Sequence, residues 1–217
     1  MGGFETWLSQ PTEAEKLFDA QVGKLLALRV PHGICIRLTY GHFLAKVQPL
    51  RKLVKNIDCS KRTKERIPFL IVLPNSFFPI PRQLARLKID DVECGVDFRS
   101  KYLTPLLDGA IPKFPYLIFD VDMGISIQGK PINECNEIVQ RNGRSCLTLE
   151  EGIALLTHFP SILRNGNKLV CAGHALGERC VTGFMHSPKT GLVLTGFSKT
   201  NACQALSFTS CAGRAVA

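Results

Sequence analysis

The stretch NGRSCLTLEEGIALL, residues 142–156, decides the fold of this chain. Thr148 and Glu151 have the T-x-x-E spacing of a capping box, in which each side chain accepts a hydrogen bond from a backbone N–H left free at the start of a helix. Acidic side chains are also favourable at this end, where the helix dipole is positive. The spacing predicts a central helix over residues 148–164, with Pro160 kinking or restarting it.

This helix has one apolar face and one unexpected residue. Leu149, Ile153, Leu156 and Phe159 recur at helical spacing, so this face is expected to turn toward the core. Gly152 lies inside the helix, where glycine costs about 1 kcal/mol relative to alanine. We therefore predict that another segment packs closely against Gly152, and we expect it to be one of the strands that follow.

The composition is that of an ordinary soluble globular protein. The chain has 217 residues, of which 45% are hydrophobic and 21% charged, enough for one sizeable core. It contains no run of 18 apolar residues that could span a membrane, and its start lacks the features of a secretory signal. Residues 1–6 fit the loose pattern for N-myristoylation, which often matches by chance. Nine cysteines without a C-x-x-C pair predict a reduced, cytoplasmic protein.

Hydrophobic periodicity predicts a single α+β domain over residues 1–217. We expect N-terminal helices, the central capped helix and a mainly antiparallel C-terminal sheet that together form one core. The turn at residues 187–191 predicts a hairpin. The expected helices are 12–30, 39–54, 79–87 and 133–140, and the expected strands are 67–74, 116–124, 168–172, 180–186, 191–196 and 203–210.

The formal net charge of +9 is concentrated in a basic stretch, residues 51–66. Its second part, around 55–66, is expected to link the N-terminal helix pair to the sheet. Such a stretch could bind nucleic acid or an anionic membrane through phosphates, although a solvated loop is the commoner outcome. No aromatic residue is interleaved with these charges, so stacking on bases is not supported.

Several motifs resemble an uncharacterised bacterial family, domain of unknown function 5701. The most specific are YLIFDVDMG at residues 116–124 and GRS followed by LTLEEGIALL at 143–156. The stretches 18–22, 68–72 and 210–214 are also similar to the family's opening helix, first strand and end. The resemblance implies a shared fold and a bacterial origin, and it implies no activity.

The chain departs from this family pattern in two places. Gly173-His174-Ala175 stands where the family has G-S-R, and residues 201–206 stand where it has N-P-H-T-W-L. Only Asn201 and Leu206 agree with the second motif. If that motif forms a site in the family, the site is altered or lost here.

An acidic pair lies at the end of the second expected strand. Asp120 and Asp122 are two residues apart, so on a strand they would point to the same side. Such a pair could bind Mg²⁺ or share a proton. Alternatively, the two acids cap the following turn or pair with Arg144, and this interpretation is favoured because no third acid lies nearby at ligand spacing.

The leading hypothesis is a protein that binds a small ligand or a protein partner without catalytic machinery. Its site is expected where Asp122, Arg144 and the first turn of the central helix meet the C-terminal strands. No cofactor and no metal ion are expected. The candidate ligand-binding residues are Asp120, Asp122, Arg144, Glu151 and Asn201.

The alternative is a thiol-dependent hydrolase or transferase. Cys203 could pair with His174 or His186 as nucleophile and base. Cys146 precedes a helix start, a position that lowers the pKa of a thiol, but the family pattern has proline there. Neither a G-x-S-x-G elbow nor a phosphate-binding loop is present, and the Cys/His spacings are irregular for zinc.

Overall fold

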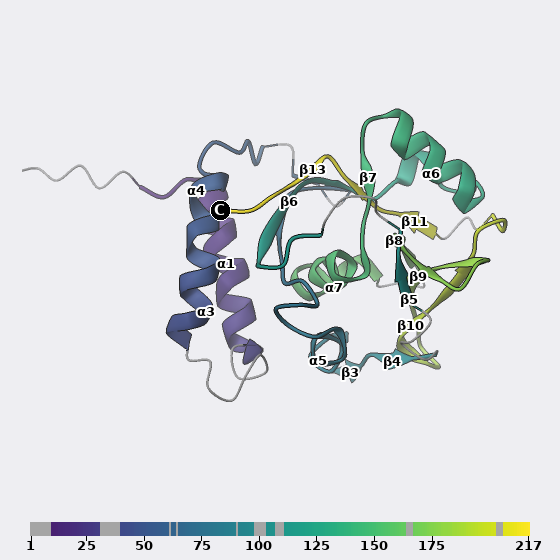
Figure 1. Cartoon of the computed structure of the whole chain (residues 1–217), viewed down its shortest axis with the longest axis horizontal. Coiled ribbons are helices and arrows are strands. Elements are labelled where there is room, and N and C mark those ends of the chain that lie inside the picture. The colour runs from purple at the N-terminus through teal and green to yellow at the C-terminus, as the bar shows by residue number, and fades with distance from the viewer. Residues whose placement is uncertain are drawn as a thin grey trace, which may run out of the picture.

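The computed structural model shows five layers in the order helix pair, sheet, helix α7, sheet and helix α6 (Figure 1). This arrangement confirms the expected α+β class. The residues that the structure describes are 10–30, 40–60, 62–63, 65–89, 91–97, 103–106, 111–163, 167–202 and 206–217.

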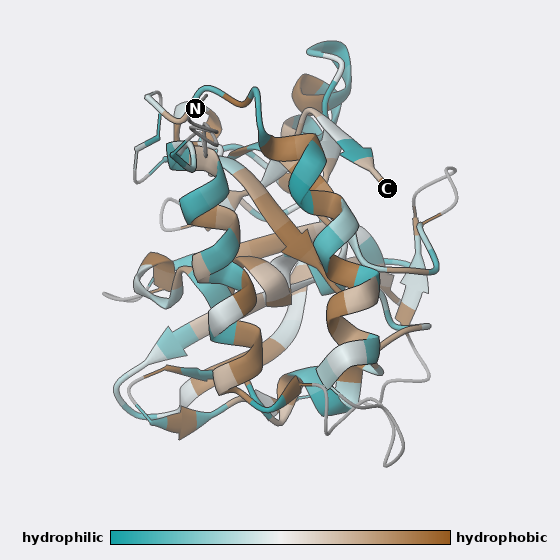
Figure 2. Cartoon of the chain, turned by 90° about the vertical axis from the view of Figure 1, so that its left-hand side faces the viewer, coloured by the Kyte–Doolittle hydropathy of each residue, from teal (hydrophilic) through white to brown (hydrophobic). Residues whose placement is uncertain are grey.

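The N-terminal helices form the first layer. Helix α1 spans Glu13–Ala27 and begins at a capping box made by Thr12 and Glu15. A second helical stretch runs through α3 (Tyr40–Val47), η1 (Gln48–Leu50) and α4 (Arg51–Val54). Both helices follow the predicted ranges, and their brown apolar sides face the strand behind them in Figure 2.

The first sheet is antiparallel, with strand order β1-β6-β12-β7, and β13 also pairs with β6. Its side chains alternate between two clusters, as the pleat of a strand requires. On β1, Phe69 and Ile71 pack against the helix pair, and Leu70 and Val72 pack toward α7. The strands are β1 (Arg66–Val72), β6 (Tyr116–Asp122), β7 (Ser145–Cys146), β12 (Ser210–Cys211) and β13 (Gly213–Ala215).

The second sheet contains the predicted hairpin. Strands β8, β9 and β10 are antiparallel neighbours, whereas β11 joins β8 and β4 joins β10 in parallel. Strand β5 pairs with the far end of β8. The strands are β4 (Gly95–Val96), β5 (Leu103–Pro105), β8 (Lys168–Leu176), β9 (Cys180–Ser187), β10 (Gly191–Ser198) and β11 (Leu206–Phe208).

Two parts of the chain differ from the sequence prediction. The expected strand 203–210 is divided, because β11 belongs to the second sheet and β12 to the first; residues 203–205 lie outside the described part. The region 88–114 lacks periodicity in the sequence, and its described residues include short strands that are too brief for a periodic pattern. Helix α5 (Ile80–Leu84) precedes this region. Within it, strand β2 (Lys88–Ile89) pairs with strand β3 (Val92–Glu93).

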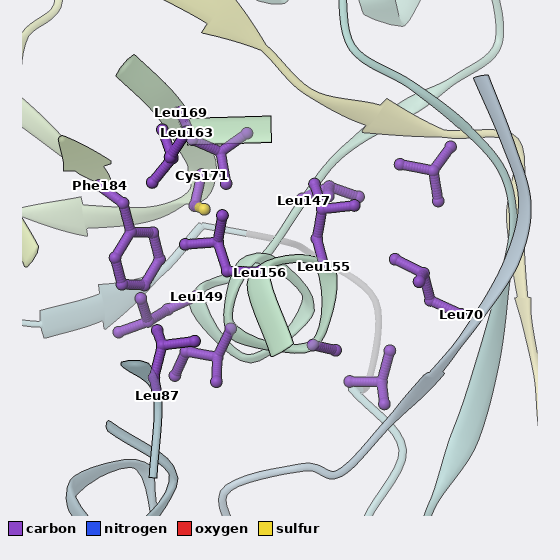
Figure 3. Close-up of a cluster of buried hydrophobic side chains, with 14 of the residues drawn as sticks. Leu70, Leu87, Leu147, Leu149, Leu155, Leu156, Leu163, Leu169, Cys171 and Phe184 are labelled. Atoms are coloured by element: carbon purple, nitrogen blue, oxygen red, sulfur yellow. The ribbon is translucent and has the colours of Figure 1, made fainter. Parts of the chain in front are cut away.

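Helix α7, Leu149–His158, lies between the two sheets. The predicted capping box is present, since Thr148 Oγ1 accepts from the Glu151 N–H and Glu151 Oε2 accepts from the Thr148 N–H. The helix ends before Pro160, and a 3-10 turn, η4 (Pro160–Leu163), restarts it. Figure 3 shows its leucines surrounded by side chains of both sheets.

Gly152 is in the close contact that its position predicts. A Cβ atom at Gly152 would lie 2.2 Å from Cys171 Sγ and 3.3 Å from Phe184 Cε2. Cys171 and Phe184 belong to β8 and β9, so the C-terminal strands are the neighbours, as expected. The glycine thus allows the second sheet to approach the helix.

Helix α6 (Ile132–Arg141) covers the outer face of the second sheet, and η3 (Ile125–Ile127) leads into it. Because both sheets are covered on both faces, the expected single core is divided into three clusters of buried side chains. Among the described residues, no helix is long and apolar enough to cross a membrane.

Candidate functional site

Asp120 is held between two arginines. Arg66 donates to its carboxylate from Nε and Nη2, and Arg144 donates from Nη1 at 2.8 Å. Arg144 Nε also donates to Ser210 Oγ at 2.9 Å. Because Arg66 first, and then Arg144, hydrogen-bond its charged form, the pKa of Asp120 falls to about 2. The ion pair between Asp120 and Arg144 is the one that we considered from the sequence as an alternative to Mg²⁺ binding.

Asp122 has a different role. Its Oδ1 accepts a hydrogen bond of 2.7 Å from the Gly124 N–H and so caps the turn after β6. Gly124 has a φ of +67°, and a Cβ there would lie 2.2 Å from the Phe208 carbonyl oxygen. Within the described residues, Arg144 forms its ion pair with Asp120 and none with Asp122. The two acids are therefore not a pair open to one ligand.

Glu151 is a fully satisfied buried carboxylate. Arg214 donates to it from Nε at 2.6 Å and from Nη2 at 2.8 Å. Tyr116 Oη and the Thr148 N–H donate at 2.9 and 2.8 Å. A carboxylate has about four acceptor sites, and these contacts occupy them. Glu151 thus joins α7 to β6 and β13, and it has no acceptor site left for a ligand.

His174 and Glu150 meet at the start of α7. His174 Nδ1 accepts from the Leu149 N–H at 3.1 Å, and its Nε2 lies 3.9 Å from Glu150 Oε2. A bulge in β8 between Cys171 and Ala175 directs His174 toward the helix. Burial lowers the pKa of His174, so its ring is neutral and Nδ1 can accept. By accepting from the Leu149 N–H, His174 caps the start of α7.

Cys94, Cys146 and Cys211 have thiols that are poor nucleophiles. All seven described cysteines are free, and burial raises the pKa of Cys94 to about 11 and those of Cys146 and Cys211 to about 12. The expectation of a lowered pKa at Cys146 is therefore wrong. The residue is buried between strands, and its Sγ donates to Asn136 Oδ1 at 3.0 Å.

The remaining members of the thiol hypothesis are not brought together by the described residues. Cys203 lies outside them, and His186 is a half-buried residue of β9. Asn201 is exposed beside Ala202, whose backbone bridges Pro131 at the start of α6. The Cys/His reaction and the contribution of Asn201 stay predictions. The N-myristoylation pattern of residues 1–6 also falls outside the described part.

A further hollow of the described residues is lined by none of the predicted site residues. It has a volume of about 690 Å³ and opens where the first sheet, the end of α7 and β11 meet. Its apolar lining is Ile67, Met123, Ile125, Phe159 and Ile162. Its polar lining is Arg62, Thr63, Glu65, Ser161, Asn167 and Ser207. A size of 300–1,000 Å³ with an apolar lining and a few polar groups is typical of small-molecule sites.

Two further hollows flank the segment 57–67. One, of about 370 Å³, is lined by Arg66 and Asp120, so a predicted site residue does border a cavity. The other, of about 580 Å³, is lined by Leu17, Cys59 and Arg62 among others. Arg62 therefore lines both this hollow and the hollow of about 690 Å³.

The arginines of the basic stretch 51–66 already have partners in the protein. Arg51 pairs with Glu15 at 2.6 Å and with Asp19 at 3.0 Å. Arg66 is bound to Asp120, and the Arg62 guanidinium lies 5.4 Å from the centroid of the Phe159 ring. Binding of nucleic acid or an anionic membrane stays a prediction, and these contacts reduce the charge available for it.

No metal site is formed by the part of the chain that the structure describes: it contains no group of three or more His, Cys, Asp or Glu side chains that could hold an ion. Sequence reasoning also missed the apolar lining of the hollow of about 690 Å³. The sequence signals for this lining were weak. Met123 and Ile125 lie just beyond a strand, and Phe159 and Ile162 lie on either side of Pro160.

Comparison with known proteins gives a family and no activity. No curated protein and no solved structure matches the chain. A family model matches residues 24–182, which include the YLIFDVDMG and LTLEEGIALL motifs and exclude residues 18–22 and 201–214. The bacterial origin and the C-terminal departures from the family thus stay predictions. Because the match covers most of the chain, the protein belongs to the family of unknown function DUF5701.

Proposed function

We propose that this protein binds a small amphipathic molecule in the pocket of about 690 Å³. The observation that carries the proposal is the lining, which combines apolar side chains from three parts of the chain with several polar side chains. Met123 follows β6, and Phe159 and Ile162 lie at the end of α7, so elements of the layered core hold the apolar side. A site built on such elements needs little reorganisation to bind.

Binding without catalysis is the function that these contacts support. Two of the predicted site residues are engaged elsewhere. His174, a candidate base, accepts from a backbone N–H, and Glu151, a candidate ligand-binding residue, holds Arg214. We also place the protein in the cytoplasm of a bacterium. The seven described cysteines, all free thiols, support a reducing compartment.

A fluorescence titration with anilinonaphthalene sulfonate tests the proposal, because this dye combines an apolar body with one anionic group. We expect saturable binding that weakens in Arg62→Gln and in Ile125→Ser. Ile125 is 43% exposed, so its replacement is not expected to unfold the protein. Arg141→Gln, on the outer helix α6, is the matched charge control and should bind as the unmodified protein does.

Two results would overturn this proposal. One is the absence of saturable dye binding to the folded protein. The other is binding that neither pocket variant changes, since the dye would then occupy another surface.

A further inference from the structure

The pocket presents two opposite charges that are not paired with each other. Arg62 and Glu65 both line it, and both are exposed. Among the described residues, neither side chain forms a hydrogen bond or an ion pair, and the recorded contact of Arg62 is with the Phe159 ring. By contrast, the neighbouring Arg66 is bound to Asp120. Within the described residues, the pocket therefore presents a cation that lies over the Phe159 ring and an anion, neither of them in an ion pair, together with an apolar lining.

The turn that carries these two charges is fixed by its backbone. The Thr63 N–H donates to the Arg66 carbonyl at 3.0 Å, and Thr63 Oγ1 accepts from the Glu65 and Arg66 N–H groups at 3.1 and 3.0 Å. The Glu65 carbonyl accepts from the Met123 N–H at 2.9 Å. These bonds anchor the turn to the strand end that supplies the apolar lining. The charges and the apolar surface thus belong to one constructed site.

We propose that the ligand is an amphipathic zwitterion, of the class of apolar amino acids and short apolar peptides. Its carboxylate contacts Arg62, its ammonium group contacts Glu65, and its apolar side chain packs on Met123, Phe159 and Ile162. This inference rests on the proposed function and names its ligand class.

The charge arrangement disfavours the simpler alternatives. A ligand with only a carboxylate would meet the like charge of Glu65, and a ligand with only an ammonium group would meet that of Arg62. Like charges brought together on binding cost affinity. A neutral apolar ligand would leave both charged groups without a partner. The zwitterion alone satisfies both.

Calorimetric titration with three molecules of the same apolar body tests this assignment. L-phenylalanine carries both charges, 3-phenylpropanoate carries the carboxylate alone, and 2-phenylethylammonium carries the ammonium group alone. We expect L-phenylalanine to bind up to about fivefold more tightly than either analogue, because one exposed charge pair contributes up to about that factor. The dipeptide Phe-Phe distinguishes a peptide site from an amino-acid site by its affinity relative to L-phenylalanine.

Single-charge variants link the preference to the two side chains. Glu65→Gln should abolish the preference for L-phenylalanine over 3-phenylpropanoate. Arg62→Gln should abolish the preference for L-phenylalanine over 2-phenylethylammonium. Glu137→Gln and Arg141→Gln remove the same charges from an exposed ion pair on α6 and should leave both preferences intact.

Equal affinity for all three molecules, or tightest binding of either analogue, would overturn the zwitterion assignment. If anilinonaphthalene sulfonate still bound in the pocket, the proposed function would survive that result. If neither the dye nor any of the three molecules bound, both would be wrong.

Discussion

Cys171 Sγ occupies the space in which a side chain at Gly152 would begin, 2.2 Å from the position of its Cβ atom. This contact brings the second sheet against the middle of α7. It explains why the helix has a glycine where alanine would form a better helix. We expect Gly152→Ala to lower the free energy of unfolding by about 1–2 kcal/mol, because overlap in a packed core outweighs the gain in helix propensity. A urea titration measures the change.

The control is a double-mutant cycle with Cys171→Ala, which leaves Cys171 Cβ at an ordinary contact distance of 3.7 Å. The double variant should be more stable than the sum of the single effects by about 1 kcal/mol. Strict additivity, or a stabilised Gly152→Ala, would show that the glycine has no packing role.

The ion pair of Glu151 with Arg214 predicts a large effect of charge removal. Glu151→Gln leaves the half-buried Arg214 guanidinium without a counter-charge and should destabilise the protein by about 3 kcal/mol. Thermal and urea unfolding measure this. Glu137→Gln breaks an exposed pair on α6 and should change stability by less than about 0.5 kcal/mol. Equal losses of stability in Glu151→Gln and Glu137→Gln would mean that the pair of Glu151 with Arg214 stabilises the protein no more than an exposed pair does.

The α+β class and its main helices and strands could be predicted from the sequence because their signals are local. The capping box of Thr148 and Glu151, the restart at Pro160 and the turn at 187–191 depend on residues adjacent in the chain. The division of the last segment between two sheets depends on pairing with strands far away in the sequence. A periodic pattern records which side chains are buried, but it does not record which partner strand buries them.

The site was harder to predict for a related reason. Asp120, Arg144 and Glu151 were predicted as ligand-binding residues, and the structure gives each of them partners within the protein. The pocket instead joins Arg62, Phe159 and Ser207, which are far apart in the chain and belong to no motif. Only the packing of the two sheets on α7 brings them together.

Two histidines predict how stability depends on pH. Burial lowers the pKa of His158 to about 3 and also lowers that of His174, from an ordinary value of 6.5. Below pH 6.5 the unfolded chain therefore takes up protons that the folded chain does not, and stability is lost as pH falls. We expect a loss of about 2 kcal/mol between pH 6.5 and 5 from His158 alone, measured by urea unfolding.

His158→Gln should flatten this pH dependence, whereas His186→Gln, on β9, should preserve it. The contribution of Asp120 is separate, because its pKa is lowered from 3.8 to about 2 and its stabilisation is lost only as pH falls through that range. A stability that is constant from pH 6.5 to 5 would contradict the assignment for both histidines.

The thiol hypothesis is tested by the rate of alkylation at pH 7. Raised pKa values predict that Cys94, Cys146 and Cys211 react with iodoacetamide more slowly than a free model thiol. Mass spectrometry of each cysteine-containing peptide gives the individual rates. A single fast reaction at Cys203 would favour the Cys/His enzyme over the binding protein, and a fast reaction at Cys146 would contradict its burial.

The strictest test of the proposed binding pocket is to determine where a ligand binds. Amide and methyl NMR spectra recorded during addition of anilinonaphthalene sulfonate report which residues the dye approaches. We predict that the largest shifts occur at Met123, Ile125, Phe159, Ile162 and Ser207, while the signals of Arg141 on α6 stay unchanged. Shifts that centre on the N-terminal helix pair, or no saturable shifts at all, would contradict this prediction.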